Sequence, residues 1–284
     1  MESQNEEFLI EKGVLRAYRG PGGVVRIPAE VRKIGDRVFQ KSAAVRGAVI
    51  PDGVCAIGVR AFAECPALQR IRLPASLRAV SGGTFCGCTG LEEVEIGGAV
   101  SRIGIFAFCG CTSLHQITLP PCVEEISPEA FANCPELKEV ATEAAVLKME
   151  RTAFWNSPQS FLAAPNLAPE DIHGGELRQR TIREFCRRRM MDEHVPPQMI
   201  TAYDGYFRSC RRQLWALALQ EEDVLQYMLA LELLDQRETR ELLEKCTTAQ
   251  RIVLLEYLHR HDDGEEKNYD RACIPDRGWC PDQI

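Results

Sequence analysis

Apolar positions in the first half of the chain recur every 23 residues. One column of this period holds Phe39, Phe62, Phe85, Phe108, Phe131 and Phe154, and three positions later stand Ser42, Cys65, Cys88, Cys111, Cys134 and Ser157. Two aliphatic columns are Val31, Val54, Leu77, Val100, Val123 and Val146, and Ile34, Ile57, Val80, Ile103, Ile126 and Met149. A fixed period in the twenties predicts a solenoid, because a single unit cannot bury its apolar side and stacked units share one continuous core.

Each unit also contains a short run in which apolar and polar residues alternate. In the run Leu68–Leu73, Ile71 and Leu73 are expected to point inward, while Arg70 and Arg72 point outward. One strand of this kind per unit predicts a parallel sheet along one side of the solenoid. The AFxxC segment predicts a helical turn that returns the chain, with its phenylalanine in a buried spine worth about 1.5 to 3 kcal/mol per ring.

One full unit, IPDGVCAIGVRAFAECPALQRIR, resembles the BspA-like leucine-rich repeats of bacterial proteins. The resemblance covers residues 27 to 158, and the preceding FLIEKGVLRAYRGPGGVVRIP resembles the usual opening of that family, with two strands and a turn. It departs at the ends, where Ser42 and Ser157 replace cysteine and residues 141–145 replace the usual strand exit. Terminal units are expected to differ because they cap the core. The resemblance implies binding through the exposed, concave side of the sheet.

The second half of the chain has a helical pattern. From Gly175 onward, apolar residues recur at three- and four-residue spacing among strong helix formers. The predicted helices cover residues 176–191, 197–219, 221–234, 237–245 and 248–260, and their pairing resembles ankyrin- or HEAT-type hairpins. The expected fold is therefore an α/β leucine-rich-repeat solenoid joined to an all-α helical domain. The expected divisions are N-terminal capping strands at 1–26, the solenoid at 27–164, the helical domain at 165–265 and a tail at 266–284.

Charge and composition narrow the class of protein. The net charge of −7 and the pI near 5.4 argue against a general nucleic-acid binder, which would carry excess Lys and Arg. The N-terminus is acidic where a signal peptide needs positive charge, and no apolar run has the length of a membrane span. The chain is therefore expected to be cytoplasmic. Its odd number of cysteines, 13, fits reduced thiols better than a disulfide scaffold.

The cysteines are the strongest candidates for chemistry. The motif CGCT occurs twice, at residues 86–89 and 109–112, which admits zinc binding or redox pairing of stacked neighbours. However, Cys88 and Cys111 belong to the inward column with Cys65 and Cys134, so that Cys86 and Cys109 are expected to face elsewhere. A structural role is favoured for the inward thiols, whereas Cys273 and Cys280 are free to pair or to bind metal. With no HExxH or GxSxG motif, we expect no cofactor, no metal and no enzyme activity.

Candidate partner-binding residues are the outward positions of the predicted strands. They are Gly47, Val49, Arg70, Arg72, Glu93, Glu95, Gln116, Thr118, Glu139 and Ala141. In register, Arg70 and Arg72 face Glu93 and Glu95, which is compatible with two roles for these residues. Either they form stabilising cross-strand ion pairs, or they belong to a surface that binds a partner.

A second candidate surface is the only basic concentration in the chain. It consists of Arg178, Arg180, Arg183, Arg187, Arg188, Arg189, Arg208, Arg211 and Arg212. These arginines form a solvated helix face, a docking site for an acidic partner, or a nucleic-acid contact that lacks aromatic residues for base stacking. The sequence thus favours a non-catalytic protein-interaction scaffold that binds through the concave sheet or through the basic helix face, chiefly Arg187, Arg188, Arg211 and Arg212. The alternative is a regulatory nucleic-acid-associated protein that uses the Arg-rich helices.

Overall fold

The computed structural model describes residues 7–144, 147–172 and 175–261. It contains a solenoid of stacked coils followed by helices, which confirms the predicted fold class. The chain divides into two compact units, Met1–Thr181 and Ile182–Ile284. The expected divisions by domain, including the end of the solenoid at residue 164, stay predictions.

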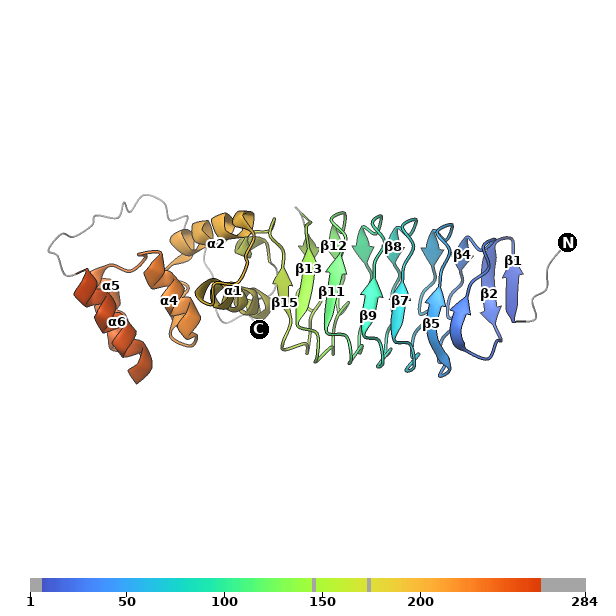
Figure 1. The fold of residues 1–284 in the computed structure, drawn as a ribbon, viewed down its shortest axis with the longest axis horizontal. Helices are drawn as coiled ribbons and strands as arrows, with labels where there is room; N and C mark the ends of the chain where they lie inside the picture. Colours follow the sequence, from blue (N-terminus) through green and yellow to red (C-terminus); the bar gives the residue numbers. More distant parts are fainter. Residues whose placement is uncertain (1–6, 145–146, 173–174, 262–284) are drawn as a thin grey trace. The chain divides into compact units, whose positions relative to one another are not determined.

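The largest sheet of the solenoid is parallel and takes one strand from each coil (Figure 1). Its strands are β3 (Gly23–Arg26), β5 (Val45–Val49), β7 (Arg70–Arg72), β9 (Glu93–Glu95), β11 (Gln116–Leu119), β13 (Glu139–Thr142) and β15 (Phe161–Ala163). Strand β7 alternates as the sequence predicted, since Ile71 is buried between exposed Arg70 and Arg72. Pairing is in register, so that equivalent residues of successive repeats lie side by side.

Two smaller sheets lie on the other side of the solenoid, and successive coils contribute to one or the other. One contains β1 (Phe8–Glu11), β2 (Val14–Tyr18), β4 (Lys33–Ile34) and β6 (Ala56–Ile57), and the other contains β8 (Ala79–Val80), β10 (Arg102–Ile103), β12 (Glu125–Ile126) and β14 (Lys148–Met149). Strands β1 and β2 form an antiparallel hairpin at the N-terminal end of the solenoid. Its Tyr18 ring lies 5.1 Å from that of Phe39 and thereby covers the first ring of the phenylalanine column.

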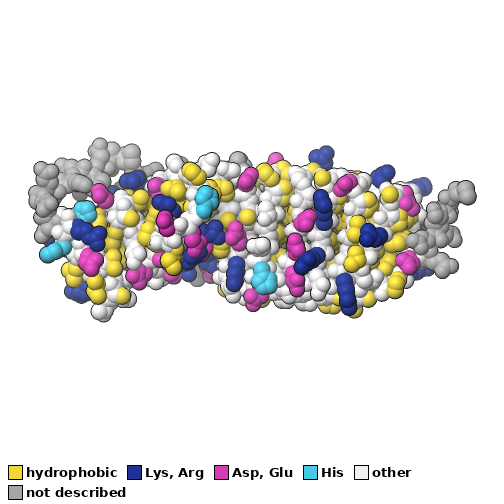
Figure 2. Space-filling model, viewed as in Figure 1, with side chains coloured by type: hydrophobic (Ala, Val, Ile, Leu, Met, Phe, Trp, Pro, Cys, Tyr) yellow, Lys and Arg dark blue, Asp and Glu magenta, His cyan; other side chains and the backbone are white. Residues whose placement is uncertain are grey.

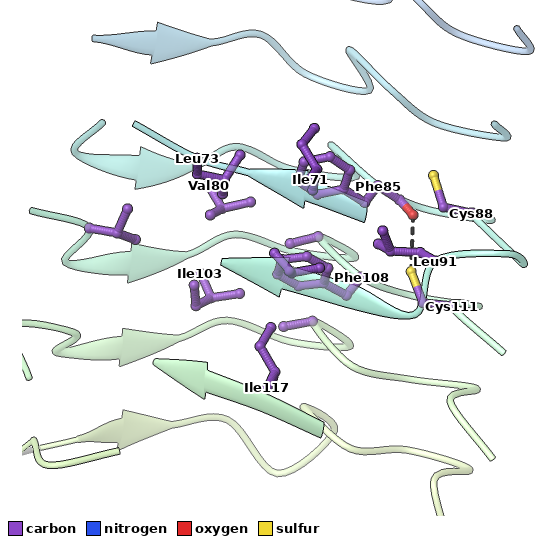
Figure 3. Close-up of a cluster of buried hydrophobic side chains, with 14 of the residues drawn as sticks. Ile71, Leu73, Val80, Phe85, Cys88, Leu91, Ile103, Phe108, Cys111 and Ile117 are labelled. Atoms are coloured by element: carbon purple, nitrogen blue, oxygen red, sulfur yellow. Dashed lines mark hydrogen bonds between the residues drawn. The ribbon is translucent and has the colours of Figure 1, made fainter. Parts of the chain in front are cut away.

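The phenylalanine column is the spine of the core. Successive rings from Phe39 to Phe154 stack with centroids 4.7 to 5.6 Å apart and interplanar angles of 4° to 16°. Figure 3 shows Phe85 and Phe108 stacked between the aliphatic side chains of the two strand rows. The AFxxC segment was predicted to form a helical turn, but it forms tight turns instead. Its backbone bonds to the neighbouring coil: the N–H of Phe85 donates to the carbonyl oxygen of Ala107 at 2.8 Å. Hydrogen bonds between coils therefore continue along this side.

Each coil reverses direction through residues in the left-handed region. The second position before the phenylalanine is left-handed in five units: Arg37, Arg60, Gly83, Phe106 and Glu129. The second position after it is left-handed in all six: Lys41, Glu64, Gly87, Gly110, Asn133 and Asn156. Glycine and asparagine adopt this conformation most easily, so their recurrence there is the sequence signal for these turns.

The C-terminal part is helical, as predicted. Its helices are α1 (Gly175–Met190), α2 (Pro197–Cys210), α3 (Trp215–Ala218), α4 (Glu222–Ala230), α5 (Gln236–Leu243) and α6 (Thr248–Arg260), and the 3-10 turn η1 (Pro169–Asp171) precedes them. Helices α5 and α6 both begin with capping boxes, at Asp235 and Thr247. These side chains satisfy backbone N–H groups that have no partner within the helix.

Two predicted helices were wrong in their extent. The helix expected at 197–219 breaks after Cys210, where residues 211–214 form tight turns with i to i+3 bonds such as that from Leu214 to Arg211. The helix expected at 221–234 ends at Ala230, because Glu232 adopts a left-handed conformation and the Leu233 N–H reaches back to Met228. This is a Schellman motif, and it could not be predicted from the sequence because glutamate occupies the position where glycine is usual.

Candidate functional site

The exposed side of the seven-stranded sheet, which we call the sheet face, gathers most of the predicted site residues. Arg70 and Glu93 are register partners and pair at 3.4 Å, while Arg72 and Glu95 pair at 3.5 Å in the next row. All four side chains are more than half exposed. The predicted cross-strand ion pairs are thus present, and their charges remain accessible to a partner in water.

The remaining predicted residues of the sheet face lie on the strands that follow. Gln116 and Thr118 are exposed on β11, and Gln116 is the register partner of half-buried Glu139 on β13. Figure 2 shows acidic and basic side chains interspersed along the solenoid rather than gathered into a patch of one sign. The sheet face therefore presents a row of ion pairs beside uncharged polar groups.

Two positions near β3 and β5 correct or extend the predicted site. Gly47 was expected to be exposed, but it is buried, and a Cβ at this position would lie 3.7 Å from Val24 Cγ2. Val24 on β3 is instead 62 % exposed, and Val49 on β5 is 47 % exposed. A β-bulge between Gly23 and Val24 shifts the register of β3 and places Val24 opposite Gly47. The first strands thus add an apolar section to the sheet face.

A hollow of about 340 Å³ adjoins the sheet face where β7 and β9 end. Its lining residues are Asp52, Arg72, Leu73, Ala75, Glu95, Ile96, Gly97 and Gly98. Gly97 stands where the flanking units have proline, and a Cβ there would lie 2.2 Å from the Pro74 carbonyl oxygen. The close approach of the two coils at this point therefore requires glycine. The ion pair of Arg72 and Glu95 lies at the edge of this hollow.

The arginines proposed for the basic helix face are engaged with acidic residues. Arg187 binds Glu184 at 2.8 Å and Glu193 at 2.7 Å, and Arg188 binds Glu184 at 2.9 Å. Burial raises the pKa of Glu184, but the hydrogen bonds from the two guanidinium groups hold it below its ordinary value overall. These arginines therefore present less uncompensated charge than the sequence suggests.

Arg211 and Arg212 converge on one carboxylate that the sequence did not single out. Glu238 lies at the start of α5 with its side chain only 3 % exposed, and its Oε1 is 3.4 Å from Arg211 Nε and 3.2 Å from Arg212 Nε. The same carboxylate accepts the N–H of Asp235 in the capping box. Its only sequence signal is the DxxE spacing of that box, because the arginines lie 26 and 27 residues away.

The inward cysteines form the predicted ladder. The thiol of Cys111 donates to the Phe85 carbonyl at 3.2 Å (Figure 3), and Cys65, Cys88 and Cys134 make the same contact with the unit before, at 3.0 to 3.1 Å. All four are fully buried. Burial raises the pKa of Cys111 well above its usual range and also raises that of Cys134, so these two thiols are neutral packing groups. The hydrogen bond with Cys88 instead lowers the pKa of Cys65.

The first cysteine of each CGCT motif lies outside the inward ladder, as expected. Cys86 and Cys109 are partly exposed on adjacent coils, and Asn133 Nδ2 lies 3.8 Å from Cys109 Sγ. Across the described ranges, no group of three or more His, Cys, Asp or Glu is placed to hold a metal ion. Cys273 and Cys280 lie outside the described residues.

Each coil contributes one strand of 3 to 5 residues to the parallel sheet. Residues 27–160 match the family model described as "BspA type Leucine rich repeat region" in 6 copies, so this part of the chain belongs to the BspA-type repeats. Leucine-rich repeats commonly serve as protein-interaction scaffolds and are typically non-enzymatic. No helix in the described part of the chain combines the length and apolar character needed to cross a membrane.

The solved structures that match the chain include leucine-rich repeat proteins from three organisms. The T. pallidum Leucine Rich Repeat protein is 28% identical, with a TM-score of 0.47 over 50% of this chain and 71% of that one. A leucine-rich repeat protein from Bacteroides ovatus is 26% identical, with a TM-score of 0.44 over 55% of this chain and 49% of that one. One from Eubacterium ventriosum is 20% identical, with a TM-score of 0.48 over 62% and 48%. The chain thus spans about half the length of the last two. No curated protein matches the sequence.

Proposed function

We propose that this chain is a non-catalytic scaffold that binds a protein partner through its sheet face. The observation that carries the proposal is the accessibility of the Arg70–Glu93 and Arg72–Glu95 pairs, which are more than half exposed in register on adjacent strands. Exposed Gln116 and Thr118 continue this surface on one side, and exposed Val49 continues it on the other. Fixed charges beside apolar and uncharged polar groups are typical of protein interfaces.

The basic helix face supports partner binding less well. Its four principal arginines all contact carboxylates of the same helical region, which compensates much of their charge. The alternative, nucleic-acid association through the Arg-rich helices, stays a prediction. Titration with duplex DNA and with RNA at two salt concentrations tests it, because phosphate contacts weaken steeply with salt.

We infer that the protein is cytoplasmic, and its inward thiols support this proposal. Each of the four donates its hydrogen to a carbonyl oxygen of the unit before it, and this contact exists only for the reduced side chain. A reducing compartment maintains that state. Fractionation of the native cells with an antibody to this chain checks the assignment.

A charge swap on the sheet face tests the binding proposal. Exchanging Arg70→Glu with Glu93→Arg keeps the cross-strand pair but inverts the charge pattern that a partner meets. The matched control exchanges Arg102→Glu with Glu125→Arg, which pair at 3.3 Å on the small strands β10 and β12. Each full-length variant is used to isolate partners from the native organism.

The proposal expects a set of partners that the control variant retains and the sheet-face variant loses. Partners that both variants retain would move the interface off this surface. Urea unfolding of both variants should match the original chain, since each ion pair is rebuilt with opposite polarity.

A further inference from the structure

Cys86 and Cys109 occupy the position directly after the phenylalanine in two consecutive coils. In the coils on either side, the same position holds Ala63 and Ala132, and both alanines are buried. The two cysteines, in contrast, are partly exposed. The turn therefore packs with a methyl group at this position, and its fold does not require a thiol.

The backbone places these two cysteines side by side. The N–H of Phe85 donates to the carbonyl oxygen of Ala107 at 2.8 Å, and the N–H of Gly87 donates to that of Cys109 at 2.7 Å. Both bonds have the offset of a parallel ladder in which residue 86 lies beside residue 109. The ring centroids of the two preceding phenylalanines are 5.3 Å apart, which indicates the spacing of the coils. A disulfide joins residues whose Cα atoms lie about 4.4 to 6.8 Å apart, so this pair is spaced for one.

The surroundings of the two sulfur atoms differ. Burial raises the pKa of Cys86, as does the neighbouring thiol of Cys109, whereas the charge of Arg60 lowers it. This interaction between the two thiols places their sulfur atoms within reach of each other. Asn133 Nδ2 donates to Cys109 Sγ at 3.8 Å, and a thiolate accepts such a bond more strongly than a thiol does. These contacts favour Cys109 as the first of the pair to react.

The inward ladder has the same spacing but not the same access. Cys88 and Cys111 are also one repeat apart, yet both are fully buried and each donates its hydrogen to a carbonyl oxygen. A thiol reacts with an oxidant where it is accessible and able to lose its proton. Among the described cysteines that are not buried, Cys86 and Cys109 are the only two that lie one repeat apart. Access therefore separates this pair from the packing thiols.

We propose that Cys86 and Cys109 are a reversible redox pair, which a peroxide converts to a disulfide between consecutive coils. The Cys109 thiolate attacks one oxygen of hydrogen peroxide, the O–O bond breaks, and hydroxide leaves as the sulfur becomes a sulfenic acid. The Cys86 sulfur then attacks this sulfur, the S–O bond breaks, and water leaves. In sum, two thiols and one hydrogen peroxide give one disulfide and two water molecules.

The proposed bond ties together the coils that lead into β9 and β11. A dithiol reductant reverses it through a mixed disulfide, so that a reducing compartment keeps the pair as thiols until the oxidant rises. This modification site goes beyond partner binding and does not depend on it.

Peroxide titration of the fully reduced, full-length chain tests the proposal. Remaining thiols are blocked with N-ethylmaleimide, and peptides from a digest without reductant are mapped by mass spectrometry. The expected result is a linked peptide pair that joins Cys86 to Cys109, forms at the same rate at every protein concentration, and is lost on treatment with dithiothreitol. Cys88 and Cys111 should remain thiols at peroxide levels that convert this pair.

Alanine variants separate the two steps of the reaction. Cys86→Ala and Cys109→Ala each introduce the residue of the flanking coils, so both variants should unfold at the temperature of the original chain. In Cys86→Ala, the sulfenic acid at Cys109 has no resolving thiol and should accumulate, as labelling with dimedone will show. In Cys109→Ala, Cys86 should stay a thiol. Cys122→Ala removes an exposed cysteine elsewhere and is the control, in which the link should form as before.

Three results would overturn the proposal. The first is that Cys86 and Cys109 both remain alkylated at peroxide levels that oxidise Cys122. The second is a disulfide that forms chiefly between chains, and the third is a link between Cys88 and Cys111 that forms as fast as the proposed one.

Discussion

Truncating the central ring of the phenylalanine column tests the energetics of the solenoid most directly. Phe108 is fully buried, and its ring centroid lies 5.3 Å from those of both Phe85 and Phe131. Phe108→Ala removes the ring from between two stacked neighbours that adjacent coils hold in place by backbone hydrogen bonds. Because the coils cannot close the cavity, we expect a loss of about 3 to 5 kcal/mol in the free energy of unfolding.

The assay must report on the solenoid alone, because the chain has two compact units. Hydrogen exchange measured by mass spectrometry at increasing urea, on peptides from residues 79–134, follows the opening of the central coils. Phe108→Leu is the matched control, and it should lose less because it leaves a smaller cavity. A loss below about 1 kcal/mol for Phe108→Ala would refute the assignment of this column as the spine of the core.

Three further outcomes follow from the buried thiols and from the buried carboxylate. Brief alkylation of the native chain should modify exposed Cys122 well before Cys111 and Cys134, which mass-spectrometric mapping will show; equal labelling would contradict the inward ladder. Burial raises the pKa of Cys134 to about 12 from 9.0, so the contribution of this thiol to stability is complete below pH 9.0 and declines toward pH 12. Urea unfolding at a series of pH values should show this decline in the original chain but not in Cys134→Ala. Glu238→Gln should cost about 1 to 3 kcal/mol of unfolding free energy by weakening its contacts with both arginines, whereas Glu241→Gln, at an exposed pair, should cost little by the same melts.

The periodic part of the fold was predictable because each coil contacts chiefly its neighbours. A column in the sequence becomes a column in space when identical units stack in register, so Phe85 and Phe108 could be placed together without coordinates. The same reasoning placed Arg70 opposite Glu93 and turned the thiol of Cys111 inward. For these residues, the 23-residue period carried the three-dimensional information.

Only the tertiary structure decided the features that occur once. The convergence of Arg211 and Arg212 on Glu238 depends on how separate helices pack, and no repeating pattern encodes it. Gly47 is buried opposite Val24, beside a bulge in the preceding strand. Phe106 is left-handed in a turn whose equivalent left-handed positions hold polar residues or glycine. The sequence by itself therefore determined the repeat, its core columns and its rows of ion pairs, because these arise from contacts between equivalent neighbours. Contacts between non-equivalent residues, and the strained backbone at which an apolar ring becomes exposed, are set by packing that only the folded chain defines.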